Sequence, residues 1–281
     1  MHKIHIVTVA TESKYYFPYL IESCKKNNIE LTVLGFDEKW QGFNWRLNLM
    51  REFLVRLPQD DIICFVDGYD VICTRDLNEL KDSFYNIKNK TKCKIIVGYH
   101  RIESHIAHLI VKFFFNGELN AGTYIGECKD LLDMFENISD RDNSSDDQQL
   151  LNEYNNQNKN IIHIDKDGEL FGTIMSSDIN PSSDVSKYYL IENNKVYIKR
   201  TNKRPFFIHG PSNSNLSIIL EKLNYNPDKT IPIQLKKEYK DKLATIINYR
   251  IINLKNKYNH IIKKIIVIVI IFILVVFFTN L

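Results

Sequence analysis

The strongest constraint on the fold is an alternation of strand-like and helix-like segments through the first hundred residues. Short apolar runs alternate with stretches whose apolar residues recur at helical spacing. The strand-like runs are 5–10, 31–34, 61–66 and 93–98, and the helical stretches between them are 19–27, 47–57 and 77–87. This alternation predicts an α/β domain with a mostly parallel sheet.

The second half of the chain is less regular. The segment LNAGTYIG (119–126) predicts a turn that enters a strand. The acidic loop DRDNSSDD (140–147) precedes a segment that we predict to be helical, at 148–151. Two further short strands are predicted at 161–164 and 206–208.

Two carboxylates follow the strand predicted at 61–66, within FVDGYDVI (65–72). Ligands of parallel sheets bind beyond the carboxyl ends of the strands, which places Asp67 and Asp70 at a ligand-binding edge. A carboxylate in apolar surroundings costs several kcal/mol unless it is paired or binds a metal. The pair therefore has two interpretations: hard oxygen ligands for Mn²⁺ or Mg²⁺, or solvated acids of an ordinary strand-end turn.

Two other positions contain residues that could bind a metal or take part in a reaction. His209 follows an apolar strand and precedes a Gly-Pro turn, so it is either a structural histidine or a third ligand of the same metal. Asp146 and Asp147 lie at a helix start, where they either cap the helix or take part in a reaction. Spacing alone does not choose between these roles.

The charge of the chain argues against nucleic acid as the partner. The net charge is +3 in 281 residues. The basic residues do not form a patch with interleaved aromatic residues, which is the usual footprint of a nucleic-acid-binding surface.

The end of the chain predicts a membrane anchor. The run IIVIVIIFILVVFF (265–278) is unbroken apolar sequence, and a helix over 261–281 would be about 31 Å long at ~1.5 Å per residue. Lysines on its N-terminal side predict a cytoplasmic main domain by the positive-inside rule. A buried core helix is the alternative. The predicted parts are a main domain at 1–227, a Lys-rich helical stalk at 228–260 and the anchor at 261–281.

Six motifs together resemble a known family. In chain order they are TVAT (8–11), VLGFDEKWQG (33–42), FVDGYDVI (65–72), LNAGTYIG (119–126), SDDQQL (145–150) and FIHGP (207–211). Each motif is weak alone, but six in this order are specific. Over roughly residues 1–225 the chain resembles the glycosyltransferase domain of the multifunctional procollagen lysyl hydroxylases and related collagen glycosyltransferases, viral versions included.

The resemblance implies a GT-A type nucleotide-diphosphosugar transferase fold and Mn²⁺, with Mg²⁺ as an alternative. It implies transfer of a hexose from a UDP-sugar to a hydroxyl acceptor on a protein or glycan, such as a hydroxylysine-linked one. By position it implies metal ligands at Asp67, Asp70 and His209, uridine contacts at Thr11, Trp40 and Tyr69, and residues near the transferred sugar at Asn120, Asp146 and Asp147.

One departure from the family favours a second hypothesis. The family has a lysine shortly after its His-Gly pair, whereas here the run after Gly210 is PSNSN. Arg46 and Lys14 are the candidates to replace its charge near the diphosphate. The alternative function is a catalytically weakened membrane protein of the same fold that binds a UDP-sugar or a partner.

Overall fold

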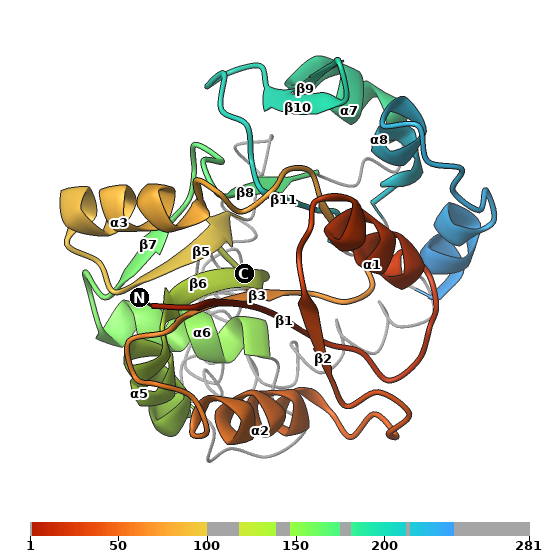
Figure 1. The fold of residues 1–281 in the computed structure, drawn as a ribbon. Helices are drawn as coiled ribbons and strands as arrows, with labels where there is room; N and C mark the ends of the chain where they lie inside the picture. Colours follow the sequence, from red (N-terminus) through yellow and green to blue (C-terminus); the bar gives the residue numbers. More distant parts are fainter. Residues whose placement is uncertain (1, 100–117, 139–146, 175–180, 212–213, 239–281) are drawn as a thin grey trace, which may run out of the picture. The chain divides into compact units, whose positions relative to one another are not determined.

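The structure is a computed structural model that describes residues 2–99, 118–138, 147–174, 181–211 and 214–238. The chain divides into two compact units, Met1–Leu235 and Lys236–Leu281. All named helices and strands belong to the first unit (Figure 1).

A six-stranded sheet forms the centre of the first unit, with the strand order β2-β1-β3-β6-β5-β7. Five of the strands run parallel and β6 runs antiparallel to both its neighbours, which confirms the prediction of a mostly parallel sheet. The strands are β1 (Ile4–Val9), β2 (Leu31–Leu34), β3 (Ile62–Val66), β5 (Ile95–Tyr99), β6 (Leu119–Glu127) and β7 (Ile162–Ile164).

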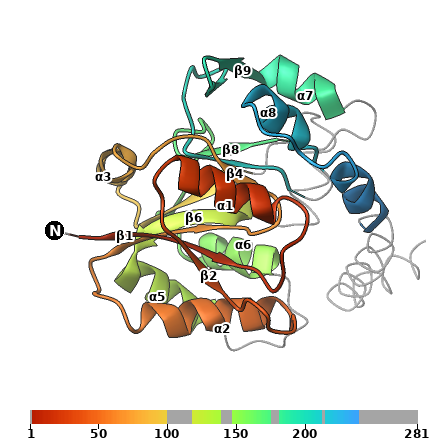
Figure 2. The same ribbon diagram turned by 45° about the vertical axis from the view of Figure 1, so that its right-hand side comes forward.

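Helices cover both faces of this sheet (Figures 1 and 2). On one face lie α1 (Phe17–Lys26) and α3 (Leu80–Thr91), and on the other lie α2 (Phe43–Leu54), α5 (Cys128–Ile138) and α6 (Asp147–Gln157). Pro18 in the first turn of α1 is at a position where its missing N–H costs no hydrogen bond. The helices predicted at 19–27, 47–57, 77–87 and 148–151 are therefore present, with shifted ends.

The buried strand β3 shows why the sheet needs helices on both sides. All five of its residues are buried. Ile63 and Phe65 join the apolar cluster on the α2, α5 and α6 side, while Ile62, Cys64 and Val66 join the cluster on the α1 and α3 side. The period of two along a strand sends alternate side chains to opposite faces, so a continuous apolar run fills both cores.

A smaller sheet with the order β4-β11-β8 packs beside the main one. It is made from β4 (Val71–Cys73), β8 (Phe171–Thr173) and β11 (Phe207–His209). Beyond it lie α7 (Pro181–Tyr188), the hairpin β9 (Tyr189–Glu192) and β10 (Lys195–Ile198), and α8 (Ser217–Lys222) (Figure 2). Of this group the sequence predicted only β11, from the apolar run before the His-Gly-Pro break; the other strands have three or four residues and are too short to show a period.

The prediction of a single-pass membrane protein is wrong on the present finding. Within the described residues no helix is long and apolar enough to cross a membrane. The longest named helices, α2 and α3, have 12 residues each, whereas a span needs about 20. The segment 261–281, on which the prediction rests, lies outside the described residues, as does the stalk beyond residue 238; residues 231–238 are helical.

Candidate metal centre

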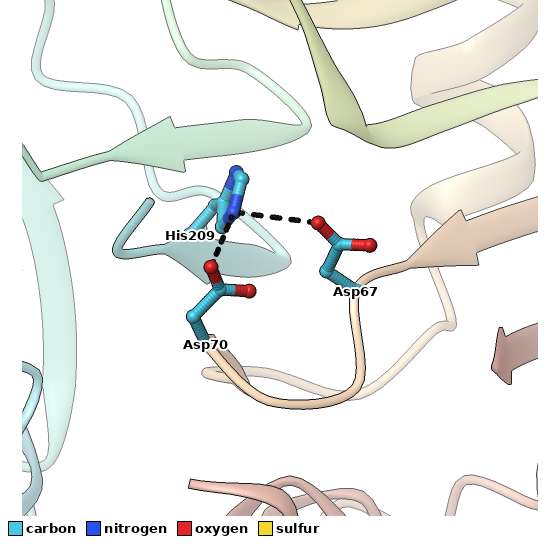
Figure 3. A group of neighbouring side chains, drawn as sticks. All are labelled: Asp67, Asp70 and His209. Atoms are coloured by element: carbon cyan, nitrogen blue, oxygen red, sulfur yellow. Dashed lines mark ion pairs between the residues drawn. The ribbon is translucent and has the colours of Figure 1, made fainter. Parts of the chain in front are cut away.

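The two acids and the histidine of the predicted metal site come together through the pairing of β4 with β11. Asp67 follows the end of β3, and Asp70 precedes the start of β4. Strand β11 runs antiparallel to β4, with His209 opposite Val71. This register brings the histidine beside Asp70, and the three side chains point toward one another (Figure 3).

The distances suit a shared cation. His209 Nε2 lies 3.2 Å from Asp70 Oδ2 and 3.8 Å from Asp67 Oδ2. One ligand atom from each residue lies within 4.8 Å of the others, and no other group of three or more such residues occurs in the part of the chain that the structure describes. The arrangement could hold one divalent ion between three protein ligands.

The electrostatics of the group are those of an enclosed set of charges. Burial raises the pKa of Asp67, against the lowering effect of the neighbouring Arg46 guanidinium. Burial opposes protonation of His209, but the Asp70 and Asp67 carboxylates outweigh it and raise the pKa of this imidazole. The histidine thus lies in a negative environment, which also favours a bound cation.

The donor set fits a divalent metal. Both ring nitrogens of His209 and Oδ1 of Asp70 are buried and make no hydrogen bond to a described residue. Buried polar atoms normally have partners, so these atoms need an explanation. Two carboxylates and an imidazole are suitable ligands for Mn²⁺, and a metal would satisfy one ring nitrogen of His209, the Nε2 that faces both carboxylates.

Gly122 on β6 has no side chain, and the His209 ring and the Asp67 carboxylate occupy the space that a side chain would fill. A Cβ atom at this position would lie 2.2 Å from His209 Cε1 and 2.7 Å from Asp67 Oδ2. The main-chain carbonyl of Gly122 also accepts a hydrogen bond from the N–H of Asp67, at 2.8 Å. A glycine inside a strand is a sequence signal for close approach of another group, and here that group is the candidate metal site.

Arg46 on α2 connects the candidate metal site to Asp147. Its guanidinium lies 2.5 Å from Asp67 Oδ1 and also forms an ion pair with the Asp147 carboxylate. The ring centres of Phe43 and Phe65 each lie 5.4 Å from Cζ of Arg46, so the arginine packs against two aromatic rings as well as pairing with carboxylates. Arg46 is thus occupied by two carboxylates.

Two hydrogen bonds of the Gln148 side chain connect the start of α6 to β6 and hold Asp147 in place. The side chain of Gln148 accepts a hydrogen bond from the N–H of Ala121 at 2.9 Å and donates one to the carbonyl of Leu119. The side-chain oxygen of Asn120 accepts a hydrogen bond from the N–H of Gly122, two residues further along β6, at 2.9 Å. Asp146 lies outside the described residues.

Of the three residues expected to contact uridine, Thr11 and Tyr69 are hydrogen-bonded to each other, whereas the ring contacts of Trp40 are with other residues. The hydroxyl of Tyr69 accepts a hydrogen bond from the N–H of Thr11 at 2.8 Å and lies 3.1 Å from the Thr11 hydroxyl. Trp40 is 43% exposed, and its ring contacts are with Phe43 and Trp45. Among the described residues no ring contact joins Trp40 to Tyr69.

The fold and the site define the chain as an α/β domain with a candidate divalent-cation centre at the carboxyl edge of its sheet. A family model described as the PLOD GT domain matches residues 1–234. The chain belongs to this family and is a PLOD-like glycosyltransferase domain. The resemblance inferred from the six motifs is confirmed.

Individual relatives agree with the family. A procollagen-lysine,2-oxoglutarate 5-dioxygenase of Drosophila melanogaster is 37% identical over 91 residues, which are 29% of this chain and 13% of that protein. A multifunctional procollagen lysine hydroxylase and glycosyltransferase of Caenorhabditis elegans is 24% identical over 234 residues, which are 76% of this chain and 31% of that protein. The chain therefore spans less than a third of the length of these curated relatives.

Among solved structures, a glycosyltransferase involved in the glycosylation of the major capsid of PBCV-1 is similar in fold, with a TM-score of 0.49 and 12% identity. The match covers 79% of this chain and 98% of that one.

Proposed function

We propose that the chain is a metal-dependent glycosyltransferase of the GT-A type that moves a hexose from a UDP-sugar to a hydroxyl acceptor on a protein or a glycan. The observation that carries the proposal is the Asp67, Asp70 and His209 group at the carboxyl edge of the sheet, within a PLOD-like glycosyltransferase domain. Enzymes of this kind need positive charge at the diphosphate of the leaving group.

In the proposed reaction, the acceptor oxygen forms a bond to the anomeric carbon of the hexose. The bond between that carbon and the β-phosphate oxygen breaks, and its electron pair leaves on UDP; the hydroxyl proton passes to a nearby carboxylate or to water. Asp67, Asp70 and His209 would hold the metal, preferably Mn²⁺. When bound, the metal neutralises charge that develops on the diphosphate.

The other residues have roles that follow from their positions. Thr11 and Tyr69 form one hydrogen-bonded unit beside Asp70, where the tyrosine ring can contact the uracil base. Asp147 would stabilise positive charge at the anomeric carbon or orient the acceptor hydroxyl, while Asn120 contributes on the sugar side. Arg46 would keep Asp67 and Asp147 in fixed positions, since it pairs with both.

Lys14 is the better candidate for the charge that the family places after its His-Gly pair. Its Nζ lies 5.2 Å from the ring centre of Tyr69 and 2.8 Å from a carboxylate oxygen of the exposed Glu12. An exposed ion pair of this kind contributes little, so Lys14 can turn to a diphosphate. Arg46, in contrast, is buried between two carboxylates.

Asp70→Asn is expected to weaken Mn²⁺-dependent UDP binding by about ten-fold or more, on the order of 1.4 kcal/mol. The substitution removes one charged ligand, and without the metal the remaining carboxylates repel the phosphates. Calorimetric titration of UDP with Mn²⁺ and with a chelator measures the effect. Asp76→Asn, on the exposed loop before α3, serves as the control that changes the same charge. Equal UDP affinity of the unmodified protein in Mn²⁺ and in chelator contradicts the proposal.

Lys14→Gln is expected to weaken UDP binding about three- to five-fold in the presence of Mn²⁺, the size of an exposed charge contact. Uridine binding should not change, because uridine has no phosphate. Lys25→Gln on α1 removes an exposed lysine of the same segment and should leave both affinities unchanged. If the variant loses affinity for uridine as strongly as for UDP, Lys14 acts on the base rather than on the diphosphate.

The absent lysine after Gly210 is the observation that favours the alternative, a UDP-sugar-binding protein with little turnover. The two functions differ in one measurement. UDP release from a panel of UDP-sugars, with and without Mn²⁺, is expected to be metal-dependent for the transferase. Metal-dependent binding without release would identify the weakened relative.

A further inference from the structure

A pocket lies on the same edge of the sheet as the candidate metal centre. It has a volume of about 700 Å³. Tyr99 at the end of β5 and Asp165 directly after β7 line it, and the hairpin residue Ile198 lies on its other side. Because β3, β5 and β7 are parallel, their carboxyl ends, and hence the two sites, lie along one edge.

The smaller sheet connects the two sites through the pairing of β8 with β11. Thr173, which lines the pocket, is in register with His209 across the β8–β11 pairing. The main-chain N–H of Ile174 donates to the carbonyl of His209 at 2.8 Å. The hydroxyl of Tyr189 donates to the carbonyl of Thr173 at 2.6 Å. This hydrogen bond connects the pocket residue Tyr189 to β8, the strand that pairs with β11.

The pocket lining contains more cationic side chains than carboxylates. Four cationic side chains line it: Lys166, Lys187, Lys199 and Arg200. Some of this charge is compensated, since Lys166 pairs with Glu118, and Arg200 lies 3.3 Å from the exposed Asp167. Lys199 donates to the neutral main-chain carbonyl of Ser186, at 2.8 Å.

The carboxylate among the pocket residues is turned to the main chain. Asp165 is buried, and its oxygens accept hydrogen bonds from the N–H groups of Glu169, Leu170 and Phe171, at 3.0, 2.7 and 2.9 Å. These bonds hold the loop between β7 and β8. The carboxylate of Asp165 is therefore satisfied by main-chain N–H groups. An anion in the pocket would contact the cationic side chains rather than this carboxylate.

The size and the ring surfaces of the pocket favour a compact ligand. The volume lies within the range of about 300–1,000 Å³ that is typical of small-molecule sites. Tyr99 and Tyr188 provide aromatic faces beside the cations, with Lys166 Nζ 5.6 Å from the Tyr99 ring centre and Lys187 Nζ 4.8 Å from that of Tyr188. Aromatic faces with nearby polar groups suit a sugar ring, whose C–H face is apolar and whose edge is polar.

We propose that this pocket is the acceptor subsite and that it takes an acidic sugar, with its carboxylate at the cations and its ring against the tyrosines. The acceptor role rests on the proposed glycosyltransferase function. Such a sugar would offer a hydroxyl toward Thr173 and the metal centre. The same charges disfavour an acceptor that carries an ammonium group.

The test measures binding of small acceptors to the full chain by ligand-observed NMR. Methyl β-glucuronide is expected to bind at least about ten-fold more tightly than methyl β-glucoside at low salt, and the difference should shrink as salt screens the charges. The double variant Lys199→Gln, Arg200→Gln should lose about ten-fold in glucuronide affinity and little in glucoside affinity. Lys195→Gln, on the same hairpin but outside the pocket lining, should change neither.

The variant Lys199→Arg, Arg200→Lys keeps both charges, so it is expected to retain the preference for glucuronide over glucoside. Equal affinity for glucuronide and glucoside in the unmodified protein overturns the proposal. So does tighter binding of 5-hydroxylysine, or of a short acidic peptide that contains serine. Mn²⁺-dependent UDP binding is measured in the same preparation: its absence contradicts the proposed donor site, whatever the acceptors do.

Discussion

Gly122→Ala is expected to weaken Mn²⁺ binding on the order of 100-fold, about 2.7 kcal/mol, and to remove metal-dependent UDP binding with it. The new methyl group would meet the His209 ring at 2.2 Å and the Asp67 carboxylate at 2.7 Å, so at least one ligand must move. Overpacking at a closely packed position also lowers the free energy of unfolding by about 1–3 kcal/mol.

The matched control is Gly126→Ala, four residues further along β6. A Cβ there would lie 3.1 Å from Leu131 Cγ, an apolar neighbour outside the site. This variant should lose some stability and keep its Mn²⁺ affinity within about three-fold. Titration of Mn²⁺, followed by the electron paramagnetic resonance signal of the free ion, compares the two. Unchanged Mn²⁺ affinity of the Gly122 variant would exclude His209 and Asp67 as joint ligands.

Asp147→Asn is expected to lower transfer on the order of 100-fold, the scale of a lost charge-stabilising or acid–base group. Asparagine has the size of aspartate and can still accept a hydrogen bond from Arg46, so α6 and the arginine keep their places. The affinities for UDP and Mn²⁺ should change by less than about three-fold, under ~0.7 kcal/mol. An effect on turnover without an effect on binding marks an interaction made in the transition state.

The control for this substitution is Glu153→Gln in the same helix, where the carboxylate accepts a hydrogen bond from Gln149 at 2.8 Å. It removes the same charge at a distance from Arg46 and should leave transfer unchanged. Transfer, UDP affinity and Mn²⁺ affinity are measured on one preparation of each variant. A fall in Mn²⁺ affinity that matches the fall in transfer would assign Asp147 to the metal site through Arg46 and Asp67.

The main sheet was predictable because its signals are local. Strand β3 is a continuous apolar run, and helices α1, α2 and α3 have apolar residues at helical spacing, so each element is recognisable within its own segment. The antiparallel direction of β6 and the small sheet were not predictable in this way. Strands of three residues show no period, and their partners lie far away in the chain.

The site was predictable in part. Residue types placed the acids at a strand end and singled out His209 and Asp147 with their roles open, and the family resemblance assigned those roles. The position of Trp40 in its motif did not reveal that its ring contacts Phe43 and Trp45, and its contact with uridine stays a prediction. The membrane prediction illustrates another limit, because it used hydropathy alone, and no described helix supports it.

Residue types and their order account for the chemical character of the site: carboxylates that follow a buried strand, and a glycine in the strand that passes beside them. The contacts between these groups arise only from the packing of distant segments. The pairing of β4 with β11 brings His209 to Asp70, and the packing of α2 against the sheet gives Arg46 its two carboxylates. Both contacts join residues from separate segments, and such contacts depend on the packing of the whole domain rather than on any local pattern.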